Sequence, residues 1–136
     1  MSIELEGLDE VLESLDNLYD MAAYDKGLEK ACLMVERAAK QKAPKGNGAL
    51  RRSITSEVKF LEGVVYTPLE YAPYVEYGTG LFAESGGRKD VPWNYKDDEG
   101  NWHSTSGMQP QPFMRPALNE NREEILRVIK ESIFND

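Results

Sequence analysis

Few side chains in this sequence are of the types that catalyse reactions or bind metal ions. The chain has one histidine, His103, and one cysteine, Cys32. Imidazole titrates near neutral pH and can act as a general base, but no serine or cysteine nucleophile motif accompanies His103. A structural zinc site uses four nitrogen or sulfur ligands, more than these two residues supply. We therefore expect an exposed histidine, a buried unreactive thiol, and no catalytic, cofactor or metal site.

Two further motifs resemble ligand-binding loops only superficially. Asp97-Asp98-Glu99 is acidic, but it lacks the alternating ligand positions and the distal glutamate of a calcium-binding loop. Gly78-Thr79-Gly80 and Gly86-Gly87 match neither of the glycine-rich patterns that hold phosphate groups. We expect the acidic residues to form a solvated hairpin tip and the glycines to form turns.

Length and composition predict a single domain over residues 1–136. The chain is 40% hydrophobic and 29% charged, which is ordinary for a globular protein with one modest core. No apolar run approaches the length of about 20 residues that spans a membrane. The acidic start, MSIELEGLDE, lacks the basic and apolar regions of a secretory signal, and a lone cysteine suits a reducing compartment. We expect the protein to fold in the cytoplasm without contacting a membrane.

Charge is distributed very unevenly along the chain. The net charge of −8 argues against a protein that wraps nucleic acid by neutralising phosphates. Residues 1–25 contain eight acidic residues and no basic one, whereas residues 37–52, which include Arg51 and Arg52, contain six basic residues and no acidic one. These segments could be two solvated faces. Alternatively, the basic segment of one subunit could meet the acidic face of the next, because complementary patches steer association and fix its register.

The hydrophobic spacing predicts helices at both ends of the chain. Apolar residues recur at helical spacing from Leu8 to Leu18, then from about Asp20 to Lys42, where Pro44 and the following glycines end the helix. A last helix begins near Pro112 or Phe113 and carries an apolar stripe that ends at Ile133.

Between these helices the spacing favours strands. Period-two alternation predicts strands over residues 53–60 and 64–67, and aromatic and β-branched residues predict a third over 71–77. Residues 91–105 read as a hairpin that turns near Asp97 to Gly100. The fold class is therefore α+β: a small antiparallel β-sheet packed on one face by N-terminal and C-terminal helices, with an extended hairpin or loop insertion at about residues 80–107.

Several aromatic side chains are candidates for contacts between subunits. In a strand, Tyr71 and Tyr77 would share one face and Tyr74 would point the other way with Glu76; the tyrosines would either line a half-buried sheet or be offered to a partner. Trp93 and Trp102 could pair across the hairpin. Two more residues would lie in the core or lock into a neighbour: Phe113 and Met114.

Three segments together resemble a known family of phage proteins. They are AAKQKAPKGNGALRRSI at residues 38–54, YAPYVEYGTG at 71–80 and WHSTSGMQPQPFMRPAL at 102–118. In this order and spacing they resemble the tail-component family typified by the gene-ten product of the lambdoid phage HK97, whose members are counted among head–tail joining or tail-completion proteins of phages and prophages. The resemblance extends from about residue 5 to residue 133.

This resemblance implies a structural virion protein rather than an enzyme. Its copies would form a ring of their own kind, expected to be hexameric, at the top of the tail tube and dock to the head connector. The genome would pass through the ring without sequence-specific binding, and acidic channel walls would repel it. The alternative is a cytoplasmic protein-binding or regulatory domain outside the virion, and a small enzyme ranks last.

Overall fold

A computed structural model describes residues 1–5, 8–46, 48–87 and 89–134, with the backbone alone at Glu10. The chain divides into two compact units. Unit 1 comprises residues 1–69 and 113–136, and unit 2 comprises residues 70–112. Helices and small antiparallel sheets together give the α+β class that the sequence predicts.

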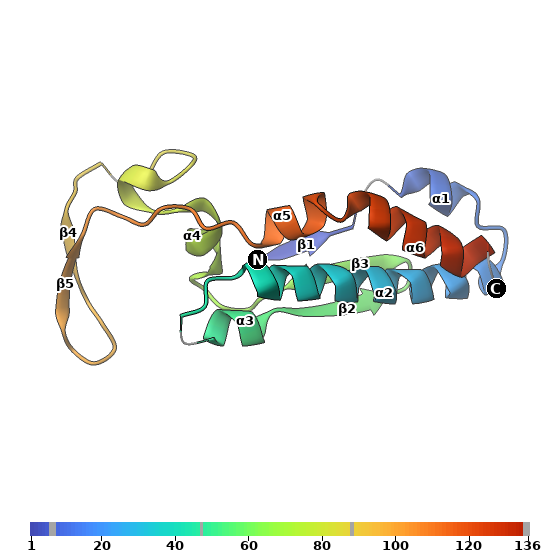
Figure 1. The fold of residues 1–136 in the computed structure, drawn as a ribbon, viewed down its shortest axis with the longest axis horizontal. Helices are drawn as coiled ribbons and strands as arrows, with labels where there is room; N and C mark the ends of the chain where they lie inside the picture. Colours follow the sequence, from blue (N-terminus) through green and yellow to red (C-terminus); the bar gives the residue numbers. More distant parts are fainter. Residues whose placement is uncertain (6–7, 47, 88, 135–136) are drawn as a thin grey trace. The chain divides into compact units, whose positions relative to one another are not determined.

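Unit 1 contains a three-stranded sheet and most of the helical residues (Figure 1). Its elements are β1 (Ser2–Glu4), α1 (Asp9–Glu13), α2 (Leu18–Lys42), α3 (Ala49–Ser53), β2 (Thr55–Lys59), β3 (Glu62–Tyr66), α5 (Met114–Asn119) and α6 (Arg122–Phe134). The strand order is β1-β3-β2 and both pairings are antiparallel, with Val65 in the central strand facing Ile3 on one side and Ser56 on the other. The N-terminal segment therefore completes the sheet from one edge.

Helix α2 holds unit 1 together because it packs on both the sheet and α6. The helix begins where the Asn17 side chain accepts a hydrogen bond from the backbone N–H of Asp20 at 3.0 Å, as a good N-cap residue does. It runs antiparallel to α6 (Figure 1). The core between these elements includes these fully or nearly fully buried side chains: Tyr24, Leu28, Cys32, Val35, Ile54, Val65, Ile125 and Ile129.

Unit 2 contains short elements and turns. Its elements are α4 (Ala72–Tyr77), the 3-10 helix η1 (Gly80–Phe82), β4 (Trp93–Lys96) and β5 (Trp102–Thr105). Strands β4 and β5 form a two-stranded antiparallel hairpin. Close backbone contacts join η1 to the segment after β5, where the Leu81 N–H donates to the Ser106 carbonyl at 3.0 Å. A Cβ on Gly80 would lie 2.3 Å from that same carbonyl oxygen, so this position needs glycine.

The first helix is a short one of about one and a half turns, Asp9–Glu13, and a separate helix begins after Asn17, as the sequence predicts. Two other expectations from the sequence are wrong in detail. Residues 72–77 form a helix and not a strand, since Pro73 fits the first turn of a helix and would disrupt a strand. The C-terminal helix is two segments, α5 and α6, with a turn at Glu120 and Asn121 between them.

Gly63 in β3 has no side chain, and this leaves the space that the Cys32 side chain of α2 occupies. A Cβ on Gly63 would lie 2.6 Å from the Cys32 sulfur. We expect Gly63→Ala to lower the free energy of unfolding by about 1–3 kcal/mol through overpacking, and Cys32→Ala to recover part of that loss in the double variant. Urea denaturation of the four proteins in the cycle measures this coupling. Additive single effects would contradict the contact, and Gly46→Ala, which meets no atom within 4 Å, is the neutral control.

Burial of Cys32 also predicts a loss of stability in alkali. Burial, with a smaller contribution from the negative charge of Glu36, raises the pKa of the thiol from 9.0 to about 11. Between these values only the unfolded chain releases the proton, so the free energy of unfolding should fall as pH rises, by up to about 1.4 kcal/mol per pH unit. Denaturation at pH 8, 9 and 10 tests this, and Cys32→Ala should flatten the slope. Equal slopes would show that the thiol ionises freely in the fold.

Candidate interaction surfaces

The three tyrosines of YAPYVEYGTG lie on one side of α4. Their spacing of three residues places them on the same helical face, and Tyr71, Tyr74 and Tyr77 are 43%, 58% and 40% exposed. Glu76, by contrast, is fully buried and is not part of this surface. In a strand it would have shared a face with Tyr74. We call Tyr71, Tyr74 and Tyr77 the tyrosine face. Large exposed rings on one side of a short helix are the kind of group that protein interfaces enrich.

The hairpin formed by β4 and β5 carries a second set of exposed aromatic rings. Trp93 lies opposite Thr105, and Trp102 lies opposite Lys96. The expected pairing of Trp93 with Trp102 is therefore wrong, because the turn sets a register in which the two indoles lie on opposite faces. Trp102 is 70% exposed, and the Lys96 ammonium lies 6.0 Å from the centre of its ring.

Asp97 organises the tip of this hairpin. Its carboxylate accepts hydrogen bonds from the backbone N–H groups of Glu99 at 3.0 Å and Asn101 at 2.8 Å. Its second oxygen lies 2.7 Å from Nε2 of His103, whose ring stacks on Tyr95 at a centroid distance of 5.2 Å. These hydrogen bonds, led by the one to His103, hold the pKa of Asp97 below its usual value. The histidine is exposed as expected, and here it supports a turn.

The basic segment is partly neutralised within unit 1. Lys40 pairs with Glu36 at 3.4 Å, and Lys42 pairs with Glu120 at 2.6 Å. Arg51 donates from Nη2 to the carbonyl of Ala43, at the C-terminal end of α2, at 3.3 Å. Arg51 thus holds the end of a helix, whereas Arg52 is exposed on α3. Of this pair, Arg52 is the side chain better placed to reach a partner.

Phe113 and Met114 lie inside the protein. Both side chains are fully buried at the start of α5. Of the two alternatives that the sequence leaves open, the structure thus places them in the core of the subunit.

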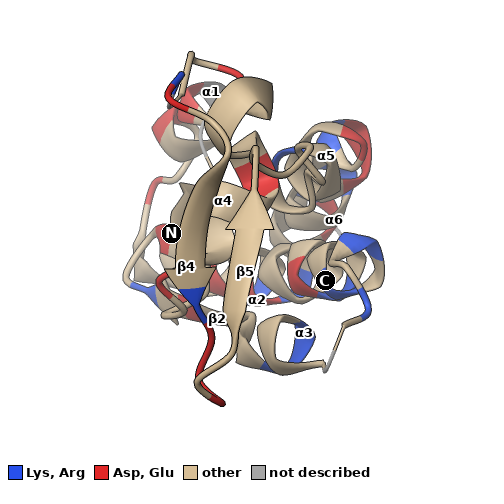
Figure 2. Ribbon diagram, turned by 90° about the vertical axis from the view of Figure 1, so that its left-hand side faces the viewer, with Lys and Arg blue, Asp and Glu red and all other residues tan. Residues whose placement is uncertain are grey.

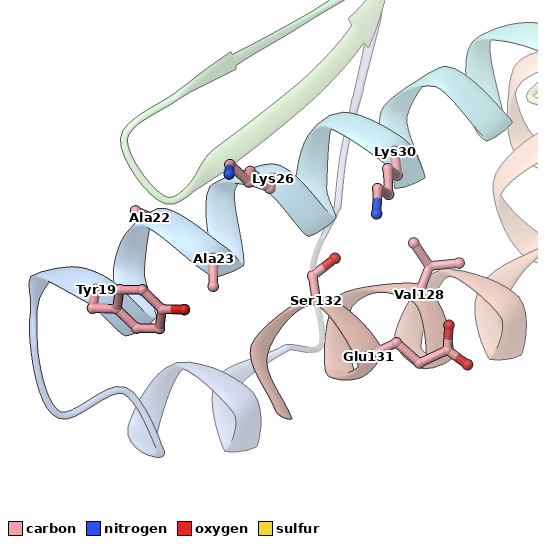
Figure 3. Close-up of a pocket in the computed structure, with 8 residues that line it drawn as sticks. All are labelled: Tyr19, Ala22, Ala23, Lys26, Lys30, Val128, Glu131 and Ser132. Atoms are coloured by element: carbon pink, nitrogen blue, oxygen red, sulfur yellow. The ribbon is translucent and has the colours of Figure 1, made fainter. Parts of the chain in front are cut away.

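A groove between α2 and α6 was not anticipated from the sequence (Figure 3). Its volume is about 480 Å³, and its lining includes Tyr19, Lys26, Lys30 and Ser132. Lys26 and Lys30 lie one helical turn apart, and Lys30 points toward α6 (Figure 3). In the sequence, both lysines are charged positions on the face of α2 outside its apolar stripe. Nothing in the pattern of α2 alone shows that α6 turns this face into one wall of a groove.

Across residues 1–5, 8–46, 48–87 and 89–134, no three histidine, cysteine or acidic side chains gather as metal ligands would. Among the same residues, no helix combines the length and apolar character needed to cross a membrane. The described residues expose aromatic rings and charged groups on defined elements. Groups of this kind are common in protein interfaces.

The comparison with protein families agrees with this picture. Residues 8–78, just over half of the chain, match the family described as "Bacteriophage HK97-gp10, putative tail-component". The chain belongs to this family. The match includes α2, the basic segment and the tyrosine face, and the family's description indicates a phage tail component. No curated protein and no solved structure matches the chain.

The contacts of Asp97 predict which residues hold the hairpin tip. Asp97→Asn or His103→Ala should loosen the turn, because each removes the charge-assisted hydrogen bond between the two side chains. We expect faster amide hydrogen exchange at Glu99 and Asn101, with unit 1 amides unchanged. The contribution of the Asp97 carboxylate is present above its unfolded pKa and is lost as pH falls through its lowered folded pKa. Asp98→Asn is the control, and equal exchange in all three variants would contradict this assignment.

Proposed function

We propose that this protein is a ring-forming tail-completion subunit of a tailed bacteriophage or prophage. In the virion, copies of the chain would close into a ring, expected to be a hexamer, at the top of the tail tube. The ring would bind the head connector on its other side and leave a channel through which the genome passes without sequence-specific contacts. The protein would assemble in the host cytoplasm and remain in the neck of the particle.

Membership in the phage tail-component family is the observation that carries this proposal. Surface chemistry supports it. A closed ring needs two unlike surfaces on each subunit, because each interface joins different faces of neighbouring copies. The tyrosine face offers one aromatic surface, and the basic residues that remain exposed near the end of α2, including Lys45 and Arg52, offer a different one. An overall charge of −8 suits a channel that does not retain duplex DNA.

A charge placed in the tyrosine face should block assembly without unfolding the subunit. Tyr74→Glu puts a carboxylate where a partner would have to desolvate it. In a phage whose own copy of the gene is deleted, we expect this variant to reduce the yield of joined particles at least about tenfold, since buried aromatic anchors dominate interface energies. Electron microscopy should then show separate heads and tails.

Phe60→Glu is the matched control, because Phe60 is 66% exposed and lies outside the tyrosine face. Its thermal unfolding and that of Tyr74→Glu should both resemble the wild type, while its particle yield should stay normal. Normal yield from Tyr74→Glu would remove the tyrosine face from the interface. Infectious particles with intact necks that lack the polypeptide entirely would overturn the proposed function itself.

A further inference from the structure

Unit 2 carries a hairpin whose two strands form a sheet of their own. Among the described residues, β4 and β5 pair with each other and with no other strand, and neither α4 nor η1 packs extensively against them. A lone two-stranded ribbon is marginal in water, and this one exposes Trp102 on one face. Such a hairpin gains stability when another surface covers its tip and its exposed indole ring.

The tip of the hairpin is a compact acidic group. The turn between β4 and β5 contains Asp97, Asp98 and Glu99, which stand out as acidic positions at the end of the hairpin (Figure 2). Asp97 is engaged in holding the turn. Asp98 and Glu99 are exposed, and neither has an ion-pair partner among the described residues. The tip therefore presents two carboxylates on a turn that hydrogen bonds have already ordered.

The groove between α2 and α6 has the opposite charge. Lys26 and Lys30 have no ion-pair partner in the described part of the chain, whereas Glu131, the acidic residue of the groove, is paired with Arg127. The lining also includes small side chains: Ala22 and Ala23, which lie one turn before Lys26 on α2, and Ser132 on α6 (Figure 3). A narrow turn can enter such a space, and two ammonium groups at its wall suit two carboxylates.

We propose that the acidic tip of the β4–β5 hairpin of one subunit docks in the α2–α6 groove of a second copy, with Asp98 and Glu99 on Lys26 and Lys30. This inference rests on the proposed ring, because a ring places a second copy beside every subunit. The contact joins two unlike surfaces, so it can repeat around an axis. It adds orientation and register to whatever apolar contact holds the ring, as complementary charges generally do.

Zero-length carbodiimide cross-linking tests this contact directly, since it joins carboxylates to lysines that touch. Assembled protein is prepared from a mixture of ¹⁴N-labelled and ¹⁵N-labelled chains, and cross-linked peptides are read by mass spectrometry. We expect peptides of mixed isotopic composition that join residues 97–101 to Lys26 or Lys30. Cross-links found only within single chains, or only to Lys45 and other lysines, would overturn the proposal.

Charge variants supply the second readout. Lys26→Glu with Lys30→Glu should reduce the fraction of protein that assembles into rings at least about tenfold, because like charges placed together cost several kcal/mol, and Asp98→Lys with Glu99→Lys should do the same. Combining all four changes in one chain restores opposite charges, so assembly, measured as the mass of the ring by light scattering, should recover. Lys130→Glu, an exposed change elsewhere on α6, is the control.

The outcomes separate this contact from the proposed function. Rings of normal mass from both double charge variants would overturn the hairpin contact and leave the ring intact. A wild-type protein that neither forms rings nor joins tails would overturn the ring. Loss of binding to a short DNA duplex by Lys26→Glu with Lys30→Glu, with ring mass unchanged, would assign the groove to phosphate groups and overturn the proposal.

Discussion

The close packing of α2 against its two neighbours is the constraint on which the rest of unit 1 depends. On one side, Gly63 in the central strand leaves room for the Cys32 sulfur. On the other side, a Cβ on Gly27 would lie 2.9 Å from the Cα of Ile129 in α6. Because backbone meets side chain or backbone at both contacts, the sheet, α2 and α6 have little freedom to slide. This packing also determines surface features of unit 1. The groove forms because α6 lies at a fixed distance from the lysines of α2. Arg51 can donate to the carbonyl of Ala43 because that residue is the C-cap of α2.

Unit 2 is organised differently, by local hydrogen bonds and glycines in place of a large core. The Asp97 carboxylate orders the hairpin turn, and backbone contacts near Gly80 and Gly107 join the two ends of the insertion. Such contacts fix the shape of short segments without burying much apolar surface, which leaves rings such as Tyr74 and Trp102 on the outside. Unit 1 is thus stabilised by packing, whereas unit 2 exposes aromatic and acidic side chains to solvent.

Much of this fold could be predicted from the sequence because its signals are local. The stripe of α2, the proline after it and the alternation of β2 and β3 each specify an element by its own spacing. The sequence favours a strand at 72–77 because tyrosine and valine are enriched in strands. Pro73, which fits the first turn of a helix, is the residue that argues for the helix instead. The register of the hairpin could not be read either, since it depends on how Asp97 closes the turn. The groove is a property of two helices far apart in the sequence, so no single stretch reveals it.

The surfaces that remain make more sense in an assembly than in a monomer. Single exposed apolar residues are normal on any protein, but here three tyrosines share one helical face. A hairpin tip carries exposed acidic groups, and a groove on the same chain is lined by lysines that have no ion-pair partner among the described residues. A two-fold dimer would bury one patch against itself, which suits self-complementary surfaces. Unlike patches on the same subunit instead favour head-to-tail contacts, and these close only if the rotation between neighbours returns to its start. Small errors in the angle between neighbouring subunits add up around a ring. In the proposed ring, the rigid packing of α2 would therefore help closure as well as stability, because elements that cannot slide keep that angle constant.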